Sequence, residues 1–280
     1  PTHLDLWQSA KDVSVLQHAN ENNLKFLPHD TTVHTLSDGD LTHSMEALSA
    51  KLDKCLGISG SFQAFQDLRP PAYRTDLYRA AQLWDTGGLW LDDKIWLTQN
   101  FSTFVNVTED TIVLPKEIDL GLESDGRAVH NGILWAIPRN PMMESIVRLI
   151  VKNIQDRSQG DGALGMWRVL DITGPITYYR AMMEHVSDTN LVARRDLQLV
   201  YDDDCTQMLT DDFTKQSCTC KSYFALEANP SKMFAFRDDQ SYHVGQDPKV
   251  HYGNLQPHQV YCDVAINDPV DPCQPHVGGQ

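Results

Sequence analysis

The sequence predicts an α/β protein with a mixed sheet flanked by helices and an irregular C-terminal part. Stretches with apolar residues at helical intervals alternate along the chain with short apolar runs that lack alternation, as expected of helices and of strands covered on both faces. Five of the six cysteines lie at or after position 205, in a region with short strand candidates and polar loops. A chain of 280 residues is long enough to bury a sizeable core.

The N-terminal part predicts short strands followed by a long helix. Leu4–Trp7, Lys25–Leu27 and Thr32–Leu36 are strand candidates. Leu41–Leu56 has apolar residues at helix-like intervals and is expected to be helical.

A second helix, followed by a buried strand, is expected in the next part. Arg69–Pro71 predicts a break, after which Thr75 caps a helix with an apolar stripe. Gly87 and Gly88 end that helix. Leu89–Leu91 then reads as a buried strand, and the tryptophans of this unit, Trp84 and Trp90, are expected to pack in the core.

The second half predicts one strongly amphipathic helix and a less regular tail. Asn140 is a helix N-cap and Pro141 occupies the first helical position. From about Tyr201 the chain has two short strand candidates, Tyr223–Leu226 and Met233–Phe236. The apolar stripe of the helix consists of Met143, Ile146, Val147, Ile150, Val151 and Ile154.

The charge of the chain excludes two classes of partner. The formal net charge is −15 at pH 7, whereas nucleic acid and anionic membranes require a basic surface. The longest uninterrupted apolar run, Ile133–Ile137, is far too short to cross a bilayer. We therefore expect no nucleic-acid partner and no membrane span in this chain.

The cysteines and two sequons indicate the compartment. Disulfides, free thiols and a structural metal all remain open for the cysteines. Asn100-Phe-Ser and Asn106-Val-Thr are N-glycosylation sequons. We expect the secretory pathway, in the Golgi lumen, with an N-terminal anchor before Pro1; the alternative is a cytoplasmic protein. The cysteines are Cys55, Cys205, Cys218, Cys220, Cys262 and Cys273.

Charged residues around the predicted buried strand are candidates for ligand binding. Asp76 and Arg79 are three apart on the expected helix, so they project on one face. Asp92 directly follows the strand. Carboxylates accept hydrogen bonds from sugar hydroxyls, and a guanidinium binds hydroxyl or phosphate oxygens. The alternative is an ordinary surface ion pair between Asp76 and Arg79, with little effect on stability.

The order of these residues resembles a known family. The segment YRTDLYRAAQLWDTGGLWLDDKI is similar to the core motif of retaining glycosyltransferases with the GT-A fold, whose glycines precede an Asp-x-Asp (DXD) motif. That family includes Och-type α-mannosyltransferases, capsular polysaccharide enzymes and glucosylating toxins. HNGILWAIPRNPMMESIV and DITGPITYY resemble later segments of the same family. The resemblance covers roughly residues 1–180.

The resemblance implies a fold and roles for individual residues. It implies a single GT-A-like, Rossmann-type domain over 1–280, with a nucleotide-sugar-binding core at 1–200 and a closing, acceptor-binding segment at 201–280. Asp76, Arg79 and Asp92 would form the catalytic site. The same three residues would bind the donor, together with Trp7, which would stack on the nucleotide base, Lys94 and Asn131.

The second aspartate of the family motif is replaced by Lys94. The resemblance implies Mn²⁺ or Mg²⁺, for which Asp92, Asp93 and His243 are the candidate ligands, with His251 as the alternative histidine. A lysine would repel such a cation. Three alternatives stay open: Lys94 itself neutralises the donor diphosphate, Asp93 turns inward while Lys94 faces solvent, or the chain keeps the fold without catalysis.

The function predicted is transfer of a sugar from a UDP- or GDP-sugar donor to a glycan, glycolipid or glycoprotein acceptor, with retention of anomeric configuration. The alternative is a catalytically inactive protein of the same fold that binds nucleotide sugars or carbohydrates. A nucleotidyltransferase is less favoured, because residues 1–30 lack a Gly-rich basic phosphate loop.

Overall fold

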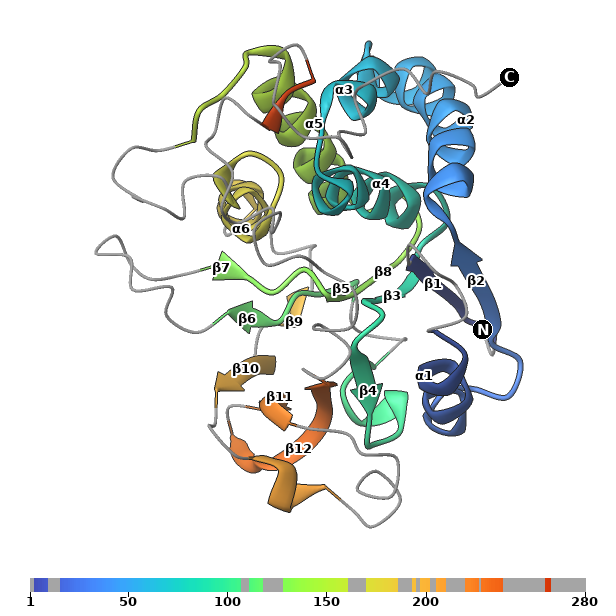
Figure 1. Ribbon diagram of the computed structural model, residues 1–280, viewed down its shortest axis with the longest axis vertical. Helices are drawn as coiled ribbons and strands as arrows, with labels where there is room; N and C mark the ends of the chain where they lie inside the picture. Colours follow the sequence, from blue (N-terminus) through green and yellow to red (C-terminus); the bar gives the residue numbers. More distant parts are fainter. Residues whose placement is uncertain are drawn as a thin grey trace, which may run out of the picture.

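The computed structural model describes residues 3–9, 16–106, 111–117, 128–160, 170–185, 193–194, 197–201, 205–209, 220–226, 228–238 and 260–262. These residues form two six-stranded mixed sheets flanked by helices (Figure 1). The predicted fold class, a Rossmann-type mixed sheet with flanking helices, is confirmed.

The first sheet has the strand order β2-β1-β3-β8-β5-β9. Strand β1 (Asp5–Ser9) is parallel to β2 (Thr32–Leu36) on one side and to β3 (Gly88–Leu91) on the other. The strand order therefore reverses between β1 and β3, and their carboxyl ends meet at one edge, where α/β proteins bind ligands. The other strands are β8 (Ile133–Ala136), antiparallel to β3, β5 (Ile112–Val113) and β9 (Ala193–Arg194).

The second sheet has the order β4-β12-β11-β10-β6-β7. Its hairpin β11–β12 contains the two strands predicted for the tail. Since β4 begins three residues after Asp92, the segment Asp92–Lys94 connects the two sheets directly. The strands are β4 (Ile95–Leu97), β6 (Lys116–Glu117), β7 (Ala128–Val129), β10 (Leu197–Tyr201), β11 (Cys220–Leu226) and β12 (Asn229–Asp238).

Helices α2 to α6 lie on one side of the first sheet, and the second sheet lies on the other side, with α1 beside β4 (Figure 1). The α-helices are α1 (Leu16–Asn23), α2 (Asp38–Leu56), α3 (Ser61–Asp67), α4 (Pro71–Thr86), α5 (Pro141–Gln155) and α6 (Pro175–Glu184). Short 3₁₀ turns are η2 (Leu24–Phe26), η3 (Phe101–Thr103) and η5 (Cys205–Met208).

The helix predicted after Asn140 is confirmed with its cap. The Oδ1 atom of Asn140 accepts hydrogen bonds from the backbone N–H groups of Met142 (2.9 Å) and Met143 (3.4 Å). Pro141 occupies the first helical position, where its missing N–H removes no helical hydrogen bond.

Two predicted boundaries are wrong. Thr75 is not a cap: α4 begins at Pro71, because a proline is compatible with the first turn of a helix and does not require a break. Lys25–Leu27 is not a strand, since residues 24–26 form a 3₁₀ turn. Both edges of β1 are already occupied by β2 and β3, so the first sheet has no place for another strand there.

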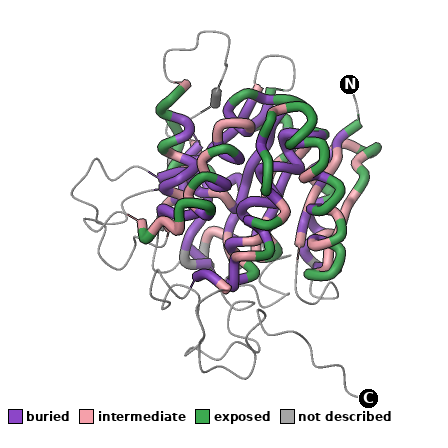
Figure 2. Tube along the Cα trace, turned by 90° about the horizontal axis from the view of Figure 1, so that it is seen from above, coloured by how far each residue is buried: buried purple, intermediate pink, exposed green. Residues whose placement is uncertain are grey.

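Two apolar clusters hold the layers together. The larger lies between the helices and the first sheet and includes Trp84 and Trp90, both buried as predicted. The second lies between the two sheets and joins Leu6 and Leu91 of the first sheet to Ala235 of the second. Figure 2 shows the buried positions in the middle of the trace and the exposed ones along its outside.

Disulfides form in the C-terminal part, in line with one of the three alternatives for the cysteines. Cys205 and Cys220 form a disulfide that ties η5 to β11, and Cys262 is also disulfide-bonded. Cys55 is a free, exposed thiol. Cys218 and Cys273 lie outside the described residues.

Within the part of the chain that the structure describes, no helix is both long enough and apolar enough to cross a membrane.

The glycine pair between α4 and β3 permits a close approach of backbones. Gly87 and Gly88 have φ of +69° and +106°, a region that other residues rarely adopt. A Cβ at Gly88 would lie 2.5 Å from the backbone oxygen of Asp5 in β1. The pair therefore lets α4 turn directly into a strand that lies beside β1.

We expect Gly88→Ala to lower the free energy of unfolding by at least about 2 kcal/mol, because a strained φ and a backbone clash act together. Gly39→Ala in the first turn of α2 is the matched control. Its nearest neighbour would be the Ser37 hydroxyl at 3.8 Å, so it should be neutral or stabilising by up to about 1 kcal/mol. Urea denaturation followed by circular dichroism measures both. Equal values for the two variants would contradict this account.

Candidate functional site

Four of the predicted site residues come together at the carboxyl end of β3. Helix α4 carries Asp76 and Arg79. Asp92 follows the last residue of β3, and Asn131 lies in the turn before β8. Helix α4, the end of β3 and the turn before β8 therefore meet at the edge where the strand order reverses.

Arg79 joins these segments. Its Nη1 atom is 3.1 Å from Asp92 Oδ1, and its Nη2 atom is 3.2 Å from Asp76 Oδ1. It also donates to the backbone oxygen of Asn131, and the guanidinium carbon lies 5.2 Å from the ring centroid of Trp90. The side chains of Asp76 and Arg79 are only 9% and 6% exposed, so this is not the ordinary surface ion pair of the alternative interpretation.

Asp76 receives further hydrogen bonds from two loops. Asn131 Nδ2 donates to its Oδ1 at 2.8 Å, and Thr173 Oγ1 donates to its Oδ2 at 2.9 Å. Tyr178 of α6 donates to its backbone oxygen at 2.9 Å. Burial raises the pKa of Asp76 to about 7, although the charge of Arg79 opposes this shift. The Asp76 carboxyl group therefore titrates close to neutral pH.

Asp92 has the opposite electrostatic character. Its Oδ1 accepts from Arg79 and, at 3.0 Å, from Trp90 Nε1. Burial acts to raise the pKa of Asp92, but Arg79 and then Lys94 outweigh it and hold the pKa below the ordinary 3.8. Asp92 is therefore ionised at neutral pH. Among the described residues no donor binds its Oδ2 atom, which can accept a hydrogen bond from a ligand.

Gly132 and His130 border the free oxygen of Asp92. A Cβ at Gly132 would lie 2.8 Å from Asp92 Oδ2 and 2.6 Å from His130 Cε1, so only glycine fits between them. His130 is buried, and its Nδ1 accepts from the Gly132 N–H at 3.2 Å. Burial lowers the pKa of His130, which keeps the imidazole uncharged at neutral pH.

The turn after Asp92 exposes one charged residue and partly buries the next. The Ile95 N–H donates to the Asp92 backbone oxygen at 3.0 Å, which closes the turn. Asp93 is exposed and Lys94 is half-buried. One of the three alternatives for Lys94 had Asp93 turned inward and the lysine facing solvent. The exposure of these two residues does not agree with that alternative.

The structure does not bring Trp7 to this cluster. Its indole stacks on His34, with ring centroids 3.9 Å apart, and its Nε1 donates to the Gly87 backbone oxygen at 3.2 Å. Gly87 precedes β3, whereas Asp92 follows it. Stacking of Trp7 on a base stays a prediction. His243 and His251 lie outside the described residues.

The sequence did not predict four residues of this site: His130, Gly132, Thr173 and Tyr178. The last two lie in the Thr-Gly-Pro segment, which carried a signal through its resemblance to the family. His130 had none beyond its place before Asn131.

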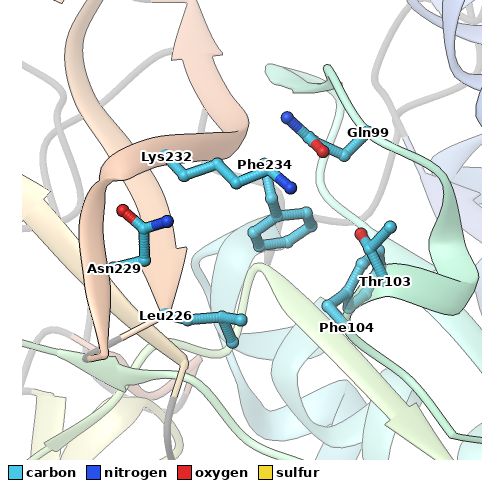
Figure 3. A pocket seen from close by; sticks show the side chains of 7 residues that line it. All are labelled: Gln99, Thr103, Phe104, Leu226, Asn229, Lys232 and Phe234. Carbon is cyan, nitrogen blue, oxygen red and sulfur yellow. The ribbon is translucent and has the colours of Figure 1, made fainter.

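Metal-binding groups and cavities elsewhere in the described part of the chain do not add to this site. No group of three or more His, Cys, Asp or Glu side chains there could hold a metal ion. A cavity between the end of β4 and the β11–β12 hairpin, shown in Figure 3, contains none of the predicted site residues. It is lined by Gln99, Thr103, Phe104, Leu226, Asn229, Lys232 and Phe234.

Comparison with known proteins finds only distant similarity. No protein-family model and no curated protein matches the chain. Among solved structures, PaToxG glycosyltransferase is 14% identical with a TM-score of 0.46, over 66% of this chain and 70% of that one. Mouse xyloside xylosyltransferase 1, in its apo form, is 12% identical with a TM-score of 0.33, over 69% of this chain and 71% of that one. Similarities this distant do not identify an activity.

The raised pKa of Asp76 predicts a pH-dependent contribution to stability. With a folded pKa of about 7 against the ordinary 3.8 of an aspartate carboxyl group, Asp76 stabilises the fold fully below pH 3.8 and loses this contribution as pH rises from there to 7. The difference in unfolding free energy between wild type and Asp76→Asn should therefore fall between about pH 4 and 7, by up to about 1.4 kcal/mol per unit, and level off above pH 7.

Urea denaturation of both proteins at several pH values measures this difference. His130→Gln serves as a control, because the lowered pKa of His130 acts in the opposite direction, removing stability as pH falls below 6.5. Parallel curves for wild type and Asp76→Asn would show that Asp76 does not titrate in this range.

Proposed function

We propose that this protein is a glycosyltransferase that moves a sugar from a UDP- or GDP-sugar donor to a glycan, glycolipid or glycoprotein acceptor, with retention of anomeric configuration. One observation carries the proposal: buried Arg79 binds both Asp76 and Asp92 at the carboxyl end of β3. The sequence resemblance assigns the same three residues to the donor site.

The location and charges of this cluster support sugar-nucleotide binding. It lies where the strand order reverses beside β1, the general position of ligand sites in α/β sheets. Ionised Asp92 can accept a hydrogen bond from a sugar or ribose hydroxyl through Oδ2. Lys94, half-buried beside it, supplies a positive charge for phosphate.

Most residues of the cluster would act by fixing the positions of Asp92 and of the turn before β8. Asp76 and Arg79 are buried and bonded to each other, so their main contribution is to fix Asp92. Asn131 bonds Asp76 and carries the carbonyl that Arg79 binds, which fixes the turn before β8. Retaining transfer of this kind needs no covalent nucleophile. Its rate comes from positioning the donor and from stabilising charge on the leaving diphosphate.

The described residues do not fit the divalent cation that the resemblance implies. Asp92 Oδ1 already accepts hydrogen bonds from Arg79 and Trp90, which leaves one oxygen. The ammonium of Lys94 acts electrostatically on that same carboxylate, and it would repel Mn²⁺ or Mg²⁺. No step of the proposed reaction is therefore assigned to a metal.

The second candidate is a nucleotide-sugar- or carbohydrate-binding protein of the same fold without turnover. Two observations favour it: Lys94 replaces the second aspartate of the family motif, and the Asp76–Arg79 pair is already satisfied within the protein.

Activity assays on a panel of UDP- and GDP-sugars test the proposal. We expect release of UDP or GDP with at least one donor, and initial release of sugar with the anomeric configuration of the donor, followed by NMR. Asp92→Asn should lower kcat/KM by about 100-fold or more, because it removes a charge that contacts the sugar. Asp93→Asn, the exposed neighbour, is the matched control and should change kcat/KM by only a few-fold.

The outcomes separate the two candidates. Tight binding of a nucleotide sugar without release from any donor would favour the binding protein. Neither binding nor release with the full panel would contradict both.

We also propose a location in the secretory pathway. Asn100 and Ser102 of the first sequon are both exposed, and the Asn100 side chain makes no capping hydrogen bond to the following turn. The disulfide Cys205–Cys220 is typical of an oxidising compartment.

In protein isolated from its own cells, we expect an N-linked glycan on Asn100, because the acceptor amide is accessible to the modifying enzyme. Peptide mass spectrometry after enzymatic removal of the glycan would show conversion of Asn100 to Asp. Ser102→Ala should abolish the modification, whereas Ser102→Thr should keep it. An unmodified Asn100 together with reduced Cys205 and Cys220 would argue for the cytoplasm.

A further inference from the structure

The β11–β12 hairpin brings an arginine to the turn that carries Asp92. Strands β12 and β4 are antiparallel, and their register pairs Arg237 with Ile95, the residue after Lys94. Successive residues of a strand point to opposite faces. Phe236 packs in a third apolar cluster, with Trp96 of β4, whereas Ala235 packs in the cluster between the sheets. Arg237 therefore lies on the inner face, like Ala235.

The burial of Arg237 agrees with this direction. The residue is half-buried, and its Nε atom has almost no exposed surface. A guanidinium that is partly removed from water loses hydration, which costs free energy. A charged side chain held next to an apolar cluster is therefore a candidate for a functional role.

His130 links Arg237 to the candidate site. Its ring packs edge-on against Phe224 of β11, with centroids 4.9 Å apart, and its Cε1 borders Gly132 on the same side as Asp92 Oδ2. His130 thus lies between the second sheet and Asp92.

The charged side chains that affect the pKa of His130 identify the groups that lie near its ring. Burial is the largest cause of its lowered pKa. Glu117 and Asp92 act against the shift, whereas Arg237 and Lys94 add to it. Because electrostatic effects of this kind fade over distances of about 10 Å, Arg237 from β12 and Lys94 from the turn both lie near the uncharged imidazole.

We propose that Lys94 and Arg237 together bind the diphosphate of the nucleotide-sugar donor, in the role that a divalent cation has in the resembled family. This inference rests on the proposed function. It assigns the binding of the anion to Lys94 in the connecting turn and to Arg237 in the C-terminal hairpin. No signal in the sequence pointed to Arg237.

The two cations would act on the leaving group. In the transfer step the bond between sugar C1 and the β-phosphate oxygen breaks, and its electron pair goes to that oxygen. The acceptor hydroxyl oxygen forms the new bond to C1 on the same face, and its proton passes to the departing phosphate oxygen. Lys94 as a point charge and Arg237 as a planar fork stabilise the negative charge that develops on the diphosphate.

Binding of UDP and GDP by isothermal titration calorimetry, in EDTA and with added Mn²⁺, tests the inference on the full chain. We expect binding in EDTA that Mn²⁺ does not improve. Lys94→Gln and Arg237→Gln should each weaken it by about tenfold or more, because each removes a charge-assisted contact to phosphate. Binding of uridine or guanosine, which lack phosphate, should stay unchanged in both variants.

Two further variants control for charge and folding. Lys232→Gln removes the same charge from the same strand, in the cavity of Figure 3, and should leave nucleotide binding unchanged. Arg237→Lys keeps the charge and should retain most of the affinity, which a purely structural role of Arg237 does not predict. Thermal unfolding of each variant identifies any loss of the fold.

The results distinguish this inference from the proposed function. A strict requirement for Mn²⁺, or wild-type affinity in both Gln variants, would overturn the diphosphate site and leave sugar transfer intact. Nucleotide binding that depends on Lys94 and Arg237, with no release from any donor, would support the site and overturn transfer. Absence of UDP and GDP binding would overturn the inference.

Discussion

The buried guanidinium of Arg79 is the interaction on which the candidate site depends. It is the point where α4, the end of β3 and the turn before β8 are joined, through Asp76, Asp92 and the backbone of Asn131. Apolar packing brings these segments close, but it does not specify their relative positions to a fraction of an ångström. A buried ion pair adds little net stability, yet losing one partner leaves an uncompensated charge. The pairing therefore restricts the cluster to one geometry.

The turn that carries Asp92 is held at both ends. On one side the Asp92 N–H donates to the Gly132 backbone oxygen at 2.8 Å, as a continuation of the first sheet. On the other, the side chain of Asn23 in α1 pairs with β4: it donates to the Ile95 oxygen at 2.9 Å and accepts from the Leu97 N–H at 2.7 Å. A side-chain amide thus satisfies the open edge of β4 as a neighbouring strand would. Residues 92–94 therefore link two strands, β3 and β4, that are each held in place.

Local signals predicted the part of the site that is local in the chain. Asp76, Arg79 and Asp92 follow from one helix, one glycine pair and one strand within a short segment, and the structure brings them together. The contributions of Thr173, His130 and Arg237 depend on how distant segments meet, which no periodicity encodes. The error at Thr75 has a similar cause, because a proline pair marks a break in some contexts and a first helical turn in others. The periodicity of apolar residues identifies a helix, but it does not specify which segments the helix packs against.

The opposite behaviour of the two carboxylates follows from where the sheets meet. Asp76 is enclosed by α4, Thr173 and Asn131, so burial dominates and its pKa rises. Asp92 lies at the junction, where Arg79 acts from the helical side and Lys94 from the connecting turn, and these charges keep it ionised. The turn that connects the two sheets adds the positive charge of Lys94 to that of Arg79, and a site for a sugar hydroxyl beside a site for phosphate requires that combination.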